Sequence, residues 1–471
     1  MYDYLQLKNK NSMIPTIPLS QFPINPVKDI DIENAYNWFK SFISDKDWLK
    51  RKNEIENYLS NIVRSSEPFS EPISEGTLLV VKKDQIGWYL YLVHVYLFEP
   101  HKYEYFQGAR VIPIFKRIGM DVNLVVKIEG INKKMREMFK KRTSEADAIL
   151  FEVLTALLWV RNGWEVKIIE EGKGPKTPDF EVVKGTEKWQ VECKRQMKTA
   201  DYTYKETKKR QIMISQISKL LLQFNILLDI KFHVELVSLP DSYLFDLLND
   251  IISTTKIPCK IISNESVDIE LSFVDIELIQ NHLKQYLVKN NSPQLFELIA
   301  KKEVDHSAFT SGFLGTFYYV GDGEANNLYI NEIAKAFGVH CYCDSENALN
   351  AKARDVRRQI KSAISQFNPE ANSIIHIGME TFDGPEVEMA RTEKLINTMS
   401  NIDPKSNKLG WIFYHYFQSY TRSYMDWYFD ETVSTATSFI NPVLPIKNTF
   451  LIIPEDEVMI EDASHWDKEL P

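Results

Sequence analysis

The chain has 471 residues, of which 44% are hydrophobic and 12% aromatic, so it can bury the core of more than one domain and is not a disordered protein. Its net charge of −9 excludes a uniformly basic surface, so any contact with nucleic acid must come from local basic clusters. With four cysteines, no signal sequence and no long apolar run, the sequence predicts a cytoplasmic protein that does not contact a membrane.

Residues 1–143 are predicted to form an extended arm followed by a mainly helical region. Prolines near the start disfavour helix, and apolar side chains then recur at helical spacing from Asp31 to Val63. The segment Ile131–Thr143 is rich in lysine and arginine. It is interpreted either as a solvated helix face or as an element that contacts phosphates.

A helix is predicted from Ser144 to Arg161, ended by Asn162 and Gly163. Its interior is apolar except for two residues, one of which is Glu152. A buried charge costs several kcal/mol unless it is paired or binds a metal. Glu152 therefore needs a partner, which can be a metal, an arginine or the solvent.

Two β-prone runs follow, separated by a turn that contains Gly185 and Thr186. A two-residue turn fixes the register of a β-hairpin, and in this register the numbers of paired residues sum to 371. Asp179 then lies opposite Glu192, and Lys194 shares their face of the hairpin because strand side chains alternate.

Two opposed carboxylates repel each other unless a cation lies between them. Mg²⁺ prefers oxygen ligands and keeps several of its waters, so Asp179 and Glu192 suffice as the main protein ligands, with Mn²⁺ as a substitute for Mg²⁺. Lys194 directs a positive charge to the same place.

Asp179 preceded by Pro178, followed by Glu192, Cys193 and Lys194, resembles the PD-(D/E)XK signature of the restriction-endonuclease-like nucleases. The resemblance implies that Asp179 and Glu192 hold the metal and that Lys194 positions or activates the attacking water. Many members carry a further glutamate on the first core helix, where Glu152 stands.

The predicted order of elements over residues 144–238 is helix, three strands, helix, strand, with the last helix from Tyr204 to Phe224 and the last strand from Ile230 to Ser238. This order resembles the αβββαβ core of the same superfamily. Basic residues cluster beside the hairpin and are expected to bind the nucleic-acid backbone. They are Arg195, Lys198, Lys205, Lys208, Lys209 and Arg210.

Residues 239–471 are predicted to form an α/β region with a regulatory or dimerisation role. Its helix from Glu346 to Phe367 carries a one-sided basic stripe, read as a solvated face or a nucleic-acid contact. The stripe comprises Arg354, Arg357, Arg358 and Lys361, with Gln359 and Gln366 nearby.

The sequence thus predicts a mixed α/β fold and an Mg²⁺-dependent endonuclease, with DNA favoured over RNA as its substrate. A role in phage defence or restriction, as a homodimer or part of a larger defence complex, is a hypothesis from this architecture alone. The alternatives are an RNA nuclease and a catalytically silent protein that binds nucleic acid or assembles on a nuclease fold.

Overall fold

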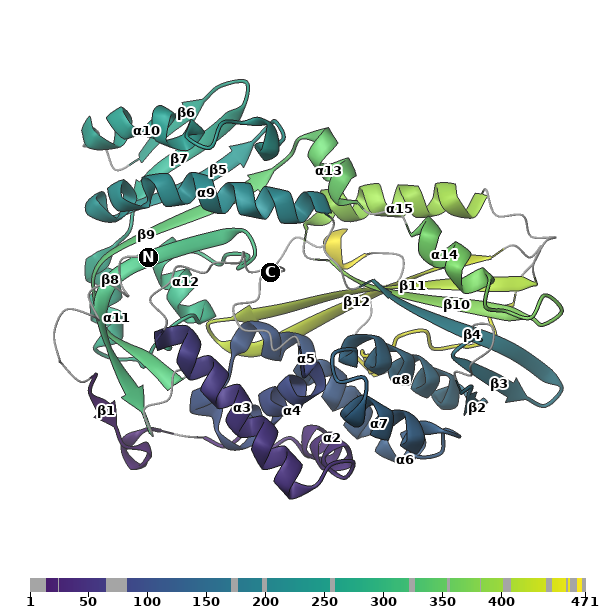
Figure 1. Cartoon of the computed structure of the whole chain (residues 1–471). Helices are drawn as coiled ribbons and strands as arrows, with labels where there is room; N and C mark the ends of the chain where they lie inside the picture. The colour runs from purple at the N-terminus through teal and green to yellow at the C-terminus, as the bar shows by residue number, and fades with distance from the viewer. Residues whose placement is uncertain are drawn as a thin grey trace.

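The computed structural model describes most of the chain and contains two six-stranded mixed sheets (Figure 1). The described residues are 14–23, 25–64, 83–170, 177–196, 201–254, 259–321, 327–353, 356–381, 383–400, 408–437, 443–454, 456–457 and 464–467. Lys198 and Arg354 lie outside them. The predicted mixed α/β class is confirmed.

The sheet that contains the hairpin has the strand order β12-β11-β10-β4-β3-β2. The β4–β10 and β10–β11 pairs are parallel, whereas the β2–β3, β3–β4 and β11–β12 pairs are antiparallel. The bounds are β2 (Glu165–Ile168), β3 (Phe180–Lys184), β4 (Glu187–Gln196), β10 (Ser373–Glu380), β11 (Leu409–Arg422) and β12 (Met425–Thr437).

Helices cover both faces of this sheet, as expected for parallel strands that are buried on both sides. Side chains on one face of the sheet pack against helices from the first half of the chain in a large apolar core. This core includes Val191, Ile374 and Phe413 of the sheet. The helices of this layer are α2 (Ile30–Lys40), α3 (Asp45–Arg64), α4 (Gln85–Phe98), α5 (Tyr105–Met120), α6 (Val122–Val125), α7 (Ile131–Lys140) and α8 (Ala146–Arg161).

The opposite face packs against α14 (Arg357–Ile364) and α15 (Pro385–Ser400). Figure 1 shows these two helices on one side of the sheet, with α5, α7 and α8 on the other. Side chains that alternate along β10 divide between the two cores: Ile374 belongs to the α8 side, and Ile375 and Ile377 belong to the α14 side. We call these two sides the α8 face and the α14 face.

The second sheet has the order β1-β8-β9-β5-β7-β6 and lies on the left in Figure 1. One of its faces is packed by α9 and α10 and the other by α11 and α12, while α13 contacts α9 and α15. The strands are β1 (Thr16–Ile17), β5 (Ile226–Phe232), β6 (Cys259–Ser263), β7 (Val267–Phe273), β8 (Phe309–Val320) and β9 (Leu328–Cys343). The helices are α9 (Asp201–Phe224), α10 (Tyr243–Thr254), α11 (Ile276–Leu283), α12 (Pro293–Ala300) and α13 (Glu346–Lys352).

The αβββαβ core expected over residues 144–238 does not form from consecutive elements, because its last strand belongs to the second sheet. Helix α9 follows β4 as expected, but the next strand, β5, pairs with β7 and β9 in the second sheet. The parallel neighbour of β4 is instead β10, which α14 precedes. Residues 201–353 therefore lie between β4 and the next elements of its layer, helix α14 and strand β10.

The basic segment predicted as one helix from Glu346 to Phe367 is two helices, α13 and α14. The boundary predicted at residue 238 does not follow sheet membership, because β6 to β9 join one sheet and β10 to β12 the other. No helix in the described part of the chain is long and apolar enough to span a membrane.

Candidate functional site

The hairpin β3–β4 forms in the predicted register. Phe180 pairs with Val191 and Lys184 with Glu187, and Gly185 in the turn has a φ of +61°. This left-handed conformation favours glycine, which explains why the short turn forms at this position. Phe180 and Val191 point into the core beneath α8, so the next residues in the register face α14.

Asp179 directly precedes β3, and its carboxylate accepts a hydrogen bond of 2.7 Å from the backbone N–H of Cys193. The strand pairing itself stops at Phe180. The hydrogen bond nevertheless keeps the Asp179 carboxylate beside β4, next to Glu192. The structure therefore brings together the two carboxylates that the sequence paired.

Glu192 is a buried acid, with 2% of its surface exposed. One of its oxygens, Oε1, accepts from the Lys194 ammonium and, at 2.6 Å, from the side-chain amide of Gln366. The other oxygen, Oε2, is buried with no hydrogen-bond partner among the described residues. Burial, and then the charge of Asp179, raise the pKa of the Glu192 carboxyl above its usual range.

Gln366 is a site residue that the sequence did not assign. It lies two residues beyond the end of α14, and its amide reaches Glu192 from the helix side of the sheet. From the sequence alone, Gln366 is identified only as a residue near the basic stripe. A usable signal would have been the strand after it, since β10 pairs with β4 and so brings the end of α14 to the hairpin.

Glu152 lies on α8, and its carboxylate forms an ion pair with Lys134 of α7. Both side chains are 12% exposed, so each supplies the partner that the burial of the other requires. Helix α8 packs on the face opposite Glu192. Within the described ranges, no group of three or more His, Cys, Asp or Glu side chains could hold a metal ion.

The basic residues expected beside the hairpin separate into two groups. Arg195 is held inside the protein: its side chain is 8% exposed, pairs with Glu380 and lies 5.2 Å above the ring of Phe417. Arg195 therefore does not form a surface for nucleic acid, because its position in the strand turns it to the α8 face.

The other described basic residues of this cluster lie on α9, whereas Lys198 is outside the described residues. Lys209 pairs with Asp241, and Arg210 donates a hydrogen bond of 2.7 Å to the carbonyl of Ser307. Lys205 and Lys208 are exposed. Among the described members of the cluster, these two keep the solvent exposure that a contact with a nucleic-acid backbone requires.

The sequence matches no family model, and comparisons with curated proteins and with solved structures gave no match either.

Proposed function

We propose that the chain is a metal-dependent nuclease that hydrolyses phosphodiester bonds, with DNA as its preferred substrate. The observation that carries the proposal is the buried Oε2 of Glu192, which has no hydrogen-bond partner among the described residues and lies beside the carboxylate of Asp179. A buried, unsatisfied carboxylate oxygen is unfavourable in the protein alone, and a cation that binds there relieves this.

The donor set fits a hard divalent cation. Asp179 and Glu192 offer carboxylate oxygens, which Mg²⁺ and Mn²⁺ prefer, and Mg²⁺ fills its remaining positions with water and substrate phosphate. When bound, such an ion would supply positive charge for the scissile phosphate and its transition state. Glu152 is left out of this ligand set because Lys134 already pairs with it.

The residues of the chain have separate roles in this proposal. The N–H of Cys193 fixes the carboxylate of Asp179, and the amide of Gln366 fixes one oxygen of Glu192. The Lys194 ammonium, which lies at the same oxygen, orients the water that attacks the phosphorus. Gln366 touches neither water nor phosphate in this scheme and is a positioning residue.

The order of elements supports a restriction-endonuclease-like core that is divided in the sequence. Helix α8, strands β2, β3 and β4, helix α14 and strand β10 follow one another as helix, three strands, helix, strand once residues 201–353 are set aside. In this arrangement α14 and β10 take the places that the sequence assigned to α9 and β5.

A protein that binds nucleic acid without cleaving it is the second candidate. The ion pair between Lys194 and Glu192 favours it, because the ammonium already neutralises the buried carboxylate. The same pair is compatible with turnover if the lysine shifts from the carboxylate to a water when a cation binds.

The test is cleavage of plasmid DNA and of RNA with Mg²⁺, Mn²⁺ or EDTA. We expect metal-dependent cleavage that is reduced about 100-fold or more in Asp179→Asn and Lys194→Ala, since each removes one component of the site. Glu181→Gln is the matched control, because Glu181 lies on β3 two residues after Asp179 and pairs with Lys188 at the surface.

Equal metal-stimulated cleavage by the wild type and Lys194→Ala would show that the activity arises elsewhere. Binding of nucleic acid without cleavage in any metal would favour the second candidate. Faster cleavage of RNA than of DNA would correct the substrate class but not the site.

A further inference from the structure

Helix α14 has a buried side and a charged side. Val356, Ile360 and Ala363 pack into the core of the α14 face, whereas Arg358 and Lys361 are exposed. Arg357, at the first position of the helix, is exposed as well. The stripe that the sequence left as a solvated face or a nucleic-acid contact is therefore present on the surface, at least over these three residues.

The structure places the C-terminal end of α14 beside the candidate site, although about 170 residues separate the two in the sequence. The connection is the hydrogen bond from Gln366, just after α14, to Glu192. An α-helix rises 1.5 Å per residue, so Arg358 and Lys361 lie within about 12 Å of Gln366 along the helix. Phosphates of one duplex strand advance about 3.4 Å each, so this length covers three to four of them.

Arg358 and Lys361 of α14 differ from two of the lysines on α7 in their ion pairing. Arg358 and Lys361 have no acidic partner within ion-pair distance in the part of the chain that the structure describes. On α7, Lys133 pairs with Glu170, and Lys134 pairs with Glu152. Lys133 and Lys134 are thus neutralised within the protein, whereas Arg136 and Lys140 of α7 are exposed to solvent. The helices α7 and α14 lie on opposite sides of the sheet (Figure 1).

We propose that Arg358 and Lys361 bind the phosphates of the nucleic-acid strand that is presented to Asp179, Glu192 and Lys194. This inference rests on the proposed function and adds the surface that holds the substrate. The contact is electrostatic and independent of base sequence, because exposed lysine and arginine side chains on a helix at the backbone recognise charge. Gln366 fixes the position of this surface relative to Glu192.

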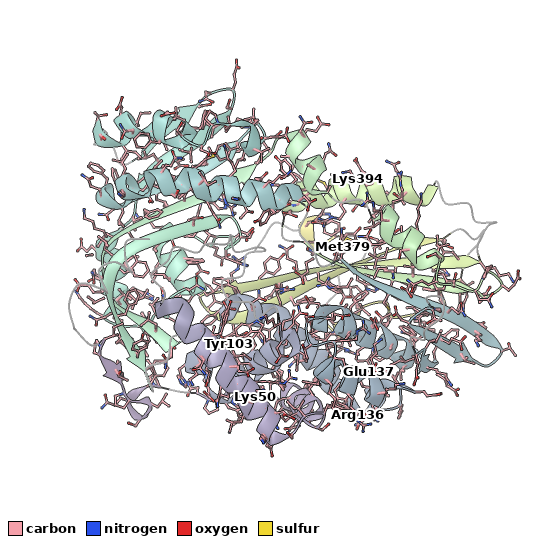
Figure 2. All side chains as sticks on the ribbon, in the orientation of Figure 1. Lys50, Tyr103, Arg136, Glu137, Met379 and Lys394 are labelled. Carbon is pink, nitrogen blue, oxygen red and sulfur yellow. The ribbon has the colours of Figure 1, made fainter. Side chains whose placement is uncertain are left out.

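The test compares two double variants in their affinity for a fluorescent DNA duplex, measured in EDTA so that no cleavage occurs. Arg358→Ala with Lys361→Ala removes the α14 charges, and Arg136→Ala with Lys140→Ala removes two exposed charges of α7. Arg136 is labelled in Figure 2, on the side of the sheet away from α14. All four side chains are exposed, so both proteins are expected to fold, which an unchanged Tm verifies.

We expect the α14 variant to bind about tenfold more weakly, with the slope of log Kd against log salt reduced by about two, because two phosphate contacts are lost. The α7 variant should bind as the wild type does. In the cleavage assay the α14 variant should show a raised KM and little change in kcat.

The outcomes separate the inference from the function on which it rests. Unchanged affinity in the α14 variant, together with cleavage that depends on Lys194, overturns the surface and leaves the nuclease in place. A loss of binding confined to the α7 variant also overturns the surface. Weaker binding by the α14 variant without cleavage by the wild type supports the surface and contradicts the nuclease, and no binding by the wild type contradicts both.

Discussion

The two faces of the sheet that contains the hairpin differ in how the charged groups around the candidate site are paired. On the α8 face, charged groups meet partners inside the protein. Glu152 pairs with Lys134, and Arg195 shares Glu380 with Arg110. Glu431 of β12 accepts three backbone N–H groups from residues 451–453.

On the α14 face, the buried Glu388 and Arg391 of α15 pair with each other, but the charged groups near the candidate site are more open. Glu192 keeps a buried oxygen without a partner, and Arg358 and Lys361 of α14 extend into solvent with no acidic partner among the described residues. The comparison shows that charge in a strand or helix does not by itself identify a site. A charged group that already has partners inside the protein contributes to the fold. A charged group without such partners is the better candidate for binding a ligand.

The largest expected effect on the α8 face is a loss of stability in Arg195→Ala. The variant removes one of the two guanidinium groups that hold the Glu380 carboxylate and also the contact with the Phe417 ring. Breaking a buried ion pair from one side costs about 3 kcal/mol. Chemical denaturation measures this difference in the free energy of unfolding.

Lys188→Ala is the control for Arg195→Ala, since Lys188 pairs with Glu181 at the surface and such a pair contributes less than about 1 kcal/mol. If Arg195→Ala unfolds like the wild type but binds nucleic acid more weakly, the comparison between the faces fails at this residue. Arg195 would then act on the nucleic-acid backbone, as the sequence predicted.

The next effect concerns Glu192 and pH. Because burial and Asp179 raise the pKa of this carboxyl, the folded protein retains the proton at pH values where the unfolded chain has lost it. A metal must displace that proton, so the affinity for Mg²⁺ should increase with pH, by up to about tenfold per unit below the raised pKa. Calorimetric titration with Mg²⁺ at several pH values measures this dependence.

The same shift has an opposite signature in EDTA. A raised pKa in the folded state gives stability that is present below the ordinary carboxyl pKa of about 4.3 and is lost as the pH rises through the folded pKa. The Tm of the wild type should therefore fall over this interval relative to that of Glu192→Gln. Parallel Tm curves for the two proteins would show that Glu192 is not a strained acid.

The sequence alone predicted the local parts of the candidate site. The turn at Gly185 and the alternation along β3 and β4 fix which residues share a face, so the proximity of Asp179 and Glu192 follows from short-range chemistry. The sequence could not predict that β5 joins the second sheet and that β10 pairs with β4 instead. Strand pairing depends on complementary apolar faces far apart in the chain, which the residues of one strand do not reveal in isolation.

The sequence also could not predict which partner each charged residue has in the fold. Glu152 was identified as a buried charge in need of a partner, and the partner is Lys134, which comes from the basic segment just before it. Arg195 follows Lys194 in the chain, yet strand alternation turns it to the opposite face, where Glu380 and Arg110 meet it. Only the packed structure distinguishes a satisfied charge from an open one.

The smallest expected effect, and the one that connects α14 to Glu192, is that of Gln366→Leu. The amide of Gln366 donates to Glu192, which favours the ionised carboxylate, so its removal should raise the pKa of Glu192 further. Cleavage should fall about tenfold near the lower end of the active pH range and recover as the pH rises, because the site then ionises despite the lost hydrogen bond.

Ser365→Ala is the matched control for Gln366→Leu: Ser365 is the neighbouring residue, and its hydroxyl donates to the carbonyl of Ser362 within the same turn. A change at Gln366 that only loosened α14 would lower cleavage equally at every pH and would also weaken DNA binding through Arg358 and Lys361. A shift of the pH profile with DNA affinity retained therefore assigns Gln366 to the carboxylate rather than to the helix. An equal loss of cleavage at every pH would contradict a direct effect of Gln366 on the Glu192 carboxyl.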